Sequence, residues 1–435
     1  MRTEDMAKTT VRVEHIARVE GHGNVRLVVD GGRVEACEMN VVEPARLFES
    51  MVRGRRLEEA PYIASRVCGI CSASHVVTDL LAVERILGVE VSDRTRALRE
   101  LLVYGSYLQN HASHLFVFAA PDFLGMRSVF PLAEADPELF SSALSVKALG
   151  NELCCAVGGR SIHPITAVVG GFTHEPARDE YLALAERMDG AREFALAAVD
   201  LFDSFSVPDV RTEGDMLAMW APGRYPVCDS REARFLDAGV SFDADDAAGE
   251  AEEYGVAHSA ALFSRVRRTG APYFTGALAR ANASWAGLCK DAKVAAAKAG
   301  LRPPERNPFR NNVAQAVEVA DALERCAALC RHLAEPDGFE GASTPLPYKA
   351  RAGRATGFTE APRGALFHEL ELDGEGRVVR ASIVTPTAQN MANLEADMRL
   401  LAEKLVAEGA EEPELRMEVE KLVRAYDPCF SCSVH

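Results

Sequence analysis

Alternating apolar and polar positions mark the first forty residues of the chain as short strands. The segments TTVRVEHI and GNVRLVVDGGRVEACEMNVV both follow this alternation, and Asp30-Gly31-Gly32 interrupts the second. Such a sequence is suited to a tight hairpin turn. A similar pattern, GALFHELELDGEGRVVRASIVTP, occurs around Asp373-Gly374. We therefore expect one β-hairpin near the start of the chain and another late in it.

Between and after these segments the apolar residues recur with the period of an amphipathic helix. Stretches containing Pro and Gly, notably VGGRSIHPITAVVGGFTHEP and STPLPYKARAGRATGFTEAPRGALFH, separate the helical segments. No internal repeat or low-complexity linker divides the sequence. The segments that we expect to be helical are residues 94–118, 137–155, 177–205, 277–298, 312–334 and 391–422.

This distribution predicts a single interlocked domain over residues 1–435, mainly α with small β-rich pieces (α+β). A chain of 435 residues with 48% apolar and 26% charged residues can bury an extensive core. We expect a β-rich part at 1–60, a helical body at 61–335, a second β-rich part at 336–390, and C-terminal helices with a metal-binding tail at 391–435.

Composition and charge exclude several classes of protein. The formal net charge of −16 argues against nucleic-acid binding, which needs a basic surface. No apolar run approaches the roughly 20 residues of a membrane span, and the start, MRTEDMAKTT, lacks the apolar stretch of a secretory signal. Eleven dispersed cysteines favour a reducing, cytoplasmic compartment. Neither GxGxxG nor GxxxxGK[ST] occurs, so we expect no nucleotide or flavin on this chain.

Two cysteine pairs carry the strongest chemical signal. SRVCGICSASH contains Cys68 and Cys71 just before a helical segment, whose N-terminus favours the thiolate form. DPCFSCSVH contains Cys429 and Cys432 after the last helical stretch. Together the pairs offer four thiolates, a soft ligand set suited to Zn, Fe–S or Ni rather than Mg or Ca.

The simplest interpretation is a structural zinc site closed by four cysteines. Two features weigh against it. The pairs of a zinc ribbon usually lie within a few tens of residues, whereas most of this chain separates Cys71 from Cys429. Each pair is also followed by a histidine, His75 or His435, which a closed four-thiolate site does not need.

The two motifs resemble the signature motifs of the large subunit of nickel–iron hydrogenases. RVEGHGNVRL, FESMVRGR, GGRSIHP, APRGALFH and TPTAQN match the same family in the same order. The short length of the chain and the segment GGRSIHPITAVVGGF are most similar to the cytoplasmic, cofactor-coupled branch. The resemblance implies the large-subunit fold with its central helical bundle, and reversible heterolytic cleavage of H2 to protons and electrons.

The resemblance also implies a nickel–iron centre whose iron holds one CO and two cyanides. Cys68 and Cys429 would be terminal ligands of nickel, while Cys71 and Cys432 would bridge nickel to iron. Heterolytic cleavage needs a Lewis-acidic metal and a nearby base. Glu20, in RVEGH, matches the glutamate that exchanges a proton with the terminal thiolate.

Further residues are implied around this centre. Arg363 would lie over the open coordination position, and Thr387 would donate to a cyanide in a pocket lined by Pro386. His75 would donate a hydrogen bond to a bridging sulfur and so tune its basicity. Asp427 would lie above the metals beside Arg363.

Two other features follow from the same resemblance. Glu49, the Ile383 carbonyl and His435 would bind a buried Mg²⁺. At the position of Asn110, many uptake enzymes have an aspartate, so this chain has one carboxylate fewer above the metals.

Electrons must leave through partners, because the chain has no second compact cysteine cluster for an Fe–S relay. The resemblance implies an Fe–S small subunit, and further electron-transfer subunits linked to NAD(P), a deazaflavin or a heterodisulfide system. It also implies a maturation protease and nickel-insertion proteins. A small subunit with a signal could export both chains. The alternatives are an H2-sensing regulatory hydrogenase and a non-catalytic relative of the quinone-site subunit of complex I, which lacks the cysteine pairs.

Overall fold

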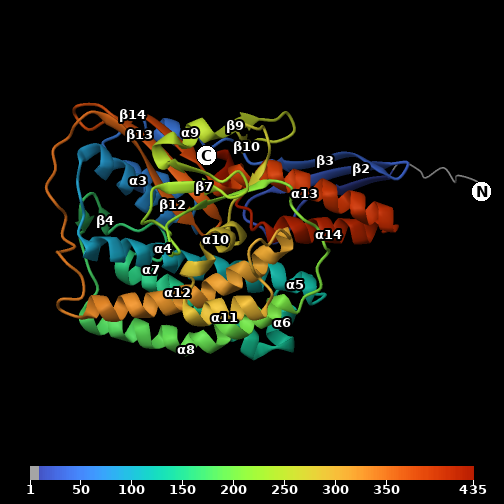
Figure 1. Ribbon diagram of the computed structural model, residues 1–435, viewed down its shortest axis with the longest axis horizontal. Helices are drawn as coiled ribbons and strands as arrows, with labels where there is room; N and C mark the ends of the chain where they lie inside the picture. Colours follow the sequence, from blue (N-terminus) through green and yellow to red (C-terminus); the bar gives the residue numbers. More distant parts are fainter. Residues whose placement is uncertain (1–8) are drawn as a thin grey trace, which may run out of the picture.

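A layer of long helices forms one side of the molecule (Figure 1). The computed structural model describes residues 9–435, so residues 1–8, part of the start discussed above, lie outside the described residues. The Ser92 hydroxyl accepts a hydrogen bond from Thr95 N and caps α4, and Asp136 caps α7 in the same way. The packed helices are α4 (Asp93–Ser113), α7 (Pro137–Gly158), α8 (Arg178–Asp203) and α12 (Asn311–Ala334).

Two segments expected to be single helices are each divided in two. Residues 277–298 form α10 (Ala277–Ser284) and α11 (Lys290–Lys298), separated at Gly287, where a Cβ atom would lie 2.1 Å from the Arg224 carbonyl carbon. Residues 391–422 belong to α13 (Pro386–Glu408) and α14 (Glu412–Ala425). Gly409, at φ 84°, ends α13 in the left-handed conformation.

Both predicted hairpins are confirmed. The first joins β2 (Gly23–Asp30) to β3 (Arg33–Val41), and β1 (Thr9–Val13) pairs with the other edge of β2. This sheet extends from the body beside α13 and α14 (Figure 1). The second joins β13 (Gly364–Leu372) to β14 (Val378–Val384), and β12 (Gly353–Ala361) completes the antiparallel sheet.

The part expected to be a helical body, 61–335, also contains strands between residues 204 and 276. They form a four-stranded sheet with the order β11-β6-β7-β8 and a separate hairpin, β9–β10. Each has five residues or fewer, which gives too few alternations for the sequence pattern to reveal a strand. The strands are β6 (Asp215–Met219), β7 (Glu232–Phe235), β8 (Val240–Asp243), β9 (Ala251–Gly255), β10 (Leu262–Val266) and β11 (Tyr273–Phe274).

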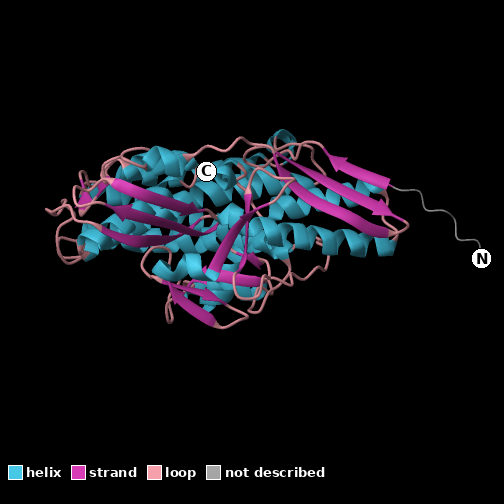
Figure 2. Cartoon of the chain, turned by 90° about the horizontal axis from the view of Figure 1, so that it is seen from above, coloured by secondary structure: helices cyan, strands magenta, loops and turns pink. Residues whose placement is uncertain are grey.

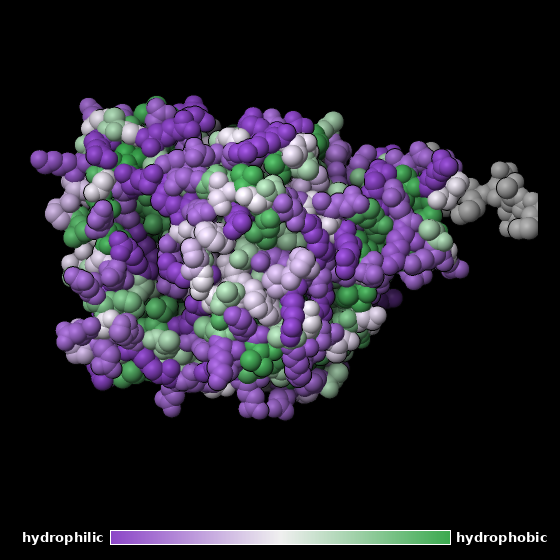
Figure 3. Space-filling view, viewed as in Figure 1, coloured by the Kyte–Doolittle hydropathy of each residue, from purple (hydrophilic) through white to green (hydrophobic). Residues whose placement is uncertain are grey.

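One buried helix, α3 (Ser72–Leu87), lies between α4 and the sheet of β12 and β13, and it positions the site described below. Figure 2 shows the strands around the helical mass, and Figure 3 shows a mostly hydrophilic face with scattered apolar groups. Within residues 9–435, no helix has the length and apolar character that crossing a bilayer requires. The shorter elements are α1 (Phe48–Val52), α2 (Ala60–Ala64), α5 (Ala120–Phe123), α6 (Phe130–Ala135), α9 (Ala247–Glu250), β4 (Ala167–Val168), β5 (Gly171–Phe172) and a π-helical turn (His114–Ala119).

Candidate metal centre

The structure brings the two cysteine pairs together in one buried cluster, although most of the chain separates them. Cys71 is the N-cap residue of α3, and Cys68 precedes it in extended backbone. Cys429 and Cys432 come from the C-terminal segment, and all four side chains are at most 5% exposed. The sulfurs of Cys68, Cys429 and Cys432 lie within 4.8 Å of one another, the one such group of His, Cys, Asp or Glu ligands in residues 9–435.

The first cysteine pair already favours one thiolate. The Cys71 amide donates to Cys68 Sγ at 3.2 Å. A hydrogen bond from the Cys71 thiol, with help from the nearby Arg363 guanidinium, lowers the pKa of Cys68. The same hydrogen bond and burial raise the pKa of Cys71. In the second pair, the sulfurs of Cys429 and Cys432 are joined as a disulfide, so this pair must be reduced before it can supply thiolate ligands.

Glu20 lies directly against Cys429. Its Oε2 atom is 2.9 Å from Cys429 Sγ, and the Ser431 hydroxyl donates to Oε1. Backbone pairing holds the two segments in register, because Phe430 N donates to the Glu20 carbonyl at 3.0 Å. The next residue, Gly21, has φ 81°, and a Cβ atom there would lie 2.9 Å from Ser431 N. Glycine therefore allows this close approach.

Arg363, at the turn between β12 and β13, reaches the cluster from another side. It is 3% exposed, and its Nε donates to Asp427 O at 2.9 Å and Asp427 Oδ1 at 3.1 Å. Its Nη1 lies 3.7 Å from Cys71 Sγ. Nη2 is buried without a protein partner. A buried guanidinium nitrogen without a protein acceptor is suited to donate to a ligand in the adjacent space.

A buried network of amides and carboxylates holds Asp427. Asn110 donates to Asp427 Oδ2 at 2.6 Å, and Gln315 of α12 donates to the same oxygen at 2.8 Å. Burial opposes ionisation, but the Arg363 guanidinium and these contacts lower the pKa of Asp427. Asn110 therefore serves as a donor to the remaining carboxylate, where a second carboxylate would repel it.

A small cavity lies among these side chains. Thr387 Oγ1 accepts a hydrogen bond from Cys429 N at 3.0 Å, which leaves the hydroxyl proton available to another acceptor. Burial, together with His368, lowers the pKa of His75 well below its ordinary value. The cavity is lined by Cys71, His75, Ala361, Arg363, Pro386, Thr387, Cys429 and Cys432.

The three residues expected to bind Mg²⁺ lie together beside the cluster. Glu49 of α1 accepts a hydrogen bond from Ile383 N at 2.8 Å. The His435 ring bonds to Cys432 O at 2.9 Å and lies near both Glu49 and the Ile383 backbone. Sequence reasoning missed Glu253 of β9. Its Oε1 is buried without a partner, and burial beside Glu49 raises its pKa to about 8. Nothing in AEEYG distinguishes this glutamate from a surface residue.

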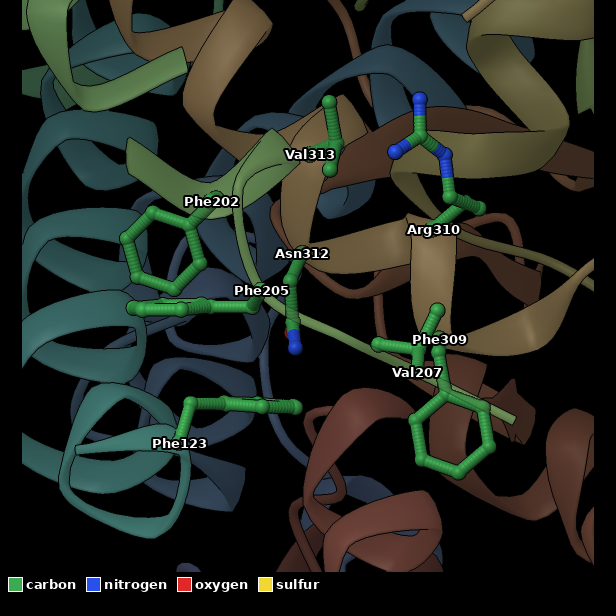
Figure 4. Close-up of a pocket in the computed structure, with 8 residues that line it drawn as sticks. All are labelled: Phe123, Phe202, Phe205, Val207, Phe309, Arg310, Asn312 and Val313. Atoms are coloured by element: carbon green, nitrogen blue, oxygen red, sulfur yellow. The ribbon is translucent and has the colours of Figure 1, made fainter. Parts of the chain in front are cut away.

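Other candidate features are remote from this cluster. Figure 4 shows a small aromatic cavity to which Phe123, Phe205 and Phe309 contribute, and none of its lining residues belongs to the site. Cys326 and Cys330 lie one turn apart on α12 and are buried in the core, which raises the pKa of each thiol. They belong to no group of three possible metal ligands within the described part of the chain.

This chain is similar to known proteins at the level of family, sequence and structure. The family model described as nickel-dependent hydrogenase matches residues 46–149 and 313–435. Sulfhydrogenase 1 subunit alpha of Pyrococcus furiosus is 33% identical over 443 residues, which cover 98% of this chain and 97% of the relative. Sulfhydrogenase 2 subunit alpha of the same organism is 31% identical over 434 residues, which cover 98% of each chain.

Among solved structures, an NAD⁺-reducing [NiFe]-hydrogenase in the H2-reduced state is similar to this chain with a TM-score of 0.86. The identity is 27%, and the match covers 98% of this chain and 99% of the other. These comparisons confirm the resemblance seen in the sequence motifs and the expected fold class.

Proposed function

The chain belongs to the nickel-dependent hydrogenase family, oxidoreductases acting on H2, and from that premise we propose that it is a catalytic large subunit. It would cleave H2 reversibly into protons and electrons, and the electrons would pass to an Fe–S partner. The observation that carries the proposal is the meeting of two cysteine pairs with Glu20 on one side and Arg363 on the other.

The residues fit a nickel–iron centre. Four sulfurs form a soft donor set, Arg363 Nη2 is a buried donor without a partner, and the Thr387 hydroxyl is free to donate. Cys68 and Cys429 would be terminal ligands, and Cys71 and Cys432 would bridge to an iron carrying CO and two cyanides. When bound, this centre supplies the Lewis acid that polarises H2.

Glu20 is the base that this chain offers for the proton. Cys429 Sγ and Glu20 Oε2 lie 2.9 Å apart, so a proton on the reduced thiol can pass to the carboxylate along a single hydrogen bond. The Ser431 hydroxyl at Oε1 and the partial exposure of Glu20 provide a continuation towards solvent. General acid–base transfer of this kind requires such hydrogen-bond distances.

Arg363 and Thr387 would orient the small ligands of iron. Two hydrogen bonds to Asp427 hold the guanidinium plane, so Nη2 is fixed in direction before any ligand arrives. Pro386 and Ala361 add apolar walls that restrict water in the cavity. Polar groups that are fixed in this way act without reorganisation.

A Mg²⁺ ion beside the cluster is part of the proposal. Glu49, the Ile383 carbonyl and His435 would supply ligands, and water would complete the shell, as Mg²⁺ prefers. The unpartnered Oε1 atom of Glu253 supports a cation here, because the neighbouring charge of Glu49 otherwise opposes ionisation of this carboxyl.

Electrons would leave near the Cys68–Cys71 loop, where Gly69 is exposed. Exposed apolar side chains of Ile162 and Ile165 lie close by, since His163 between them bonds to Ser65 and Ser72. This surface suits an Fe–S small subunit. The likeness to an NAD⁺-reducing enzyme supports an NAD(P)-linked subunit over a deazaflavin or heterodisulfide partner. A cytoplasmic location, a maturation protease and nickel-insertion proteins belong to the same proposal.

An infrared spectrum of the mature protein tests the proposal. Bands from one CO and two cyanides are expected. They can be assigned to the metal centre, because protein groups do not absorb in that region. Turnover of H2 then distinguishes an enzyme from an H2 sensor. A spectrum without these bands from nickel-replete, mature protein would reject the proposal and favour a structural zinc site at the four cysteines.

A further inference from the structure

The turn that carries Arg363 is not of a kind that the two strands beside it hold in place. Ala361 pairs with Gly364, so Pro362 and Arg363 form a two-residue turn between β12 and β13, and neither has a positive φ. The turns favoured in two-residue hairpins need a positive φ at the first central residue, which proline cannot adopt. The direction of Arg363 therefore needs support from outside the hairpin.

A second buried arginine, Arg280 of α10, supplies this support. Its Nη1 donates to the Ala361 carbonyl at 3.0 Å, and its Nη2 donates to the Pro362 carbonyl at 2.9 Å. Arg280 is 2% exposed, and both turn residues are buried. Because buried carbonyl groups need hydrogen-bond donors, this guanidinium fixes the two residues that precede Arg363.

The other donors of Arg280 are anchored to carboxyl groups. Nε and Nη2 donate to Glu318 at 2.6 Å and 2.7 Å, and Nη1 also donates to Glu360 Oε2 at 3.0 Å. All five N–H groups of the guanidinium therefore have an acceptor, in one planar arrangement. An ammonium group has three donors on a single nitrogen and cannot make the same set of contacts.

The same network also reaches the guanidinium of Arg363. Glu318 Oε2 lies 2.8 Å from His111 Nε2, and His111 Nδ1 lies 3.2 Å from Asn110 Nδ2. Asn110 donates to Asp427, which accepts from Arg363 Nε. Arg363 is therefore held both at its backbone and at its guanidinium, and Glu318 connects the two supports.

We propose that Arg280 is a positioning residue that fixes the direction of Arg363 Nη2 in the cavity among the cysteines. It acts through the backbone of the turn and does not itself line that cavity. The role of Nη2 as a donor to a ligand of the metal centre rests on the proposed function. The position of Arg363 does not depend on it.

Hydrogen exchange at the Arg363 Nε–H group tests this in the metal-free full chain, by NMR with nitrogen-15-labelled arginine. The signal is assigned through its loss in Arg363→Lys. In Arg280→Lys we expect exchange to become about 10-fold faster or more, because the turn loses buried hydrogen bonds and opens more often.

Arg99→Lys is the matched control. Arg99 is also 2% exposed and is bonded to a carboxylate, Glu84, through two nitrogens, but it does not contact the turn. Exchange at Arg363 should keep the wild-type rate in this variant.

Glu318→Gln decides the matter if Arg280→Lys does not fold. The glutamine has the size of the glutamate but takes one acceptor from Arg280, so it should accelerate the same exchange to a smaller extent. In mature protein, Arg280→Lys should shift the cyanide bands and lower turnover per bound nickel by about 10- to 100-fold. Arg99→Lys should leave the bands in place.

Exchange at the wild-type rate in folded Arg280→Lys, or in Glu318→Gln where the first variant does not fold, would overturn the proposal. An equal acceleration in Arg99→Lys would do so too, because the effect would then be a general loosening of the fold. Unchanged bands in nickel-loaded Arg280→Lys protein would also contradict it. If mature wild-type protein has no CO or cyanide bands, the proposed function fails instead, and the exchange rates still decide what positions Arg363.

Discussion

Glu20 and Arg363 contact the cysteine cluster from two sides, and single atoms of each side chain make these contacts. Glu20 contacts Cys429 through one carboxylate oxygen, while Ser431 holds the other. Arg363 uses Nε for Asp427 and Nη1 for Cys71, which leaves Nη2 for a ligand. A substitution that preserves the size of the side chain but changes these atoms therefore tests its chemical role while the metal site can still assemble.

Replacement of Glu20 by Gln should leave the metals bound and slow H2/D⁺ exchange by about 100-fold or more, since an amide cannot accept the proton. The amide oxygen can still accept from the Ser431 hydroxyl, so the C-terminal segment should remain closed. Isotope exchange, with nickel content as the control, measures this. Exchange at the wild-type rate would remove Glu20 from the proton path.

Replacement of Arg363 by Lys should allow assembly but reduce turnover by roughly 100-fold, because misplaced groups near reacting atoms cost about this much. An ammonium group cannot contact Asp427, Cys71 and a ligand at once in one plane, as the guanidinium does. The measurement is turnover per bound nickel. Full turnover would mean that the planar group is dispensable.

The sequence predicted which residues meet at this site, because the motifs around the cysteines, Glu20 and Arg363 are long and local. It did not predict Glu253, His368 or Asp79. Each of these is a common residue type in an unremarkable stretch. Only the packing of β9 and β13 brings Glu253 near Glu49 and His368 into contact with His75 and Asp79. Groups that act through another side chain leave no local signal.

The helix α4 shows how an element delivers several polar groups at once. It continues into the π-helical turn His114–Ala119, and such turns often lie at functional sites. Asn110 reaches Asp427, His111 reaches Glu318, and His114 reaches Gln315 and the Arg424 carbonyl. The π-helical turn therefore begins where the buried end of α4 makes several side-chain hydrogen bonds at once.

The crossing of α4 and α7 depends on Gly150. A Cβ atom there would lie 2.8 Å from both Gln109 N and Gly105 O. Gly150→Ala should lower the free energy of unfolding by about 1–3 kcal/mol through overpacking. Gly190→Ala, in α8 with no atom within 4 Å of the new methyl, should raise it by roughly 0.5–1 kcal/mol. Urea denaturation measures both, and equal effects would contradict this account.

The layer between α10, α12 and β12 should make stability depend on pH. Burial raises the pKa of Glu360 from 4.5 to about 7, despite its contact with Arg280. The folded chain then holds a proton that the unfolded chain releases, so this stabilisation is complete below pH 4.5 and is lost as the pH rises through 7. The loss should amount to about 3 kcal/mol.

Glu360→Gln should flatten this pH dependence, because the amide stays neutral. Urea denaturation of both proteins across this range is the measurement. Glu318 should add little to this slope, since Arg280 and His111 lower its pKa to about 2 and its contribution to the free energy of unfolding is lost only as the pH falls towards that value. An unchanged slope in the variant would assign the dependence to another group.

At the level of elements, long helices and both hairpins followed from periodicity and turn residues. The strands of residues 204–276 did not, and neither did the breaks after α10 and α13. Gly287 is required by contact with the Arg224 backbone, which lies far away in sequence. Local patterns therefore predicted the elements whose own residues determine them, and missed those determined by distant neighbours.

At the scale of the whole molecule, segments that are distant in sequence meet at the metal site. Residues from three parts of the chain contact one another in one place: Glu20 and Cys68 near the start, Arg363 in the last quarter, and Cys429 and Cys432 at the end. The long helices and the β12–β14 sheet bring these segments together but contribute few of the reactive atoms. Stability of the complete fold and occupancy of the site should therefore be linked.

Metal loading should raise the free energy of unfolding by about 3 kcal/mol when the metals exceed their dissociation constants about 100-fold. Thermal unfolding of mature and metal-free protein measures this difference. Cys429→Ser should lose both nickel and the added stability. Equal unfolding temperatures for loaded and metal-free wild-type protein would contradict the linkage.

The distance along the chain between Cys68 and Cys429, whose sulfurs lie 3.7 Å apart, has a kinetic consequence. Contacts between residues so far apart in sequence form late in folding, because the entropy of closing the intervening loop must be overcome first. A nascent chain on the ribosome lacks one side of this site until its synthesis is almost complete. Interrupted or partly folded chains should therefore have no activity at all, because no fragment of the sequence contains a partial catalyst.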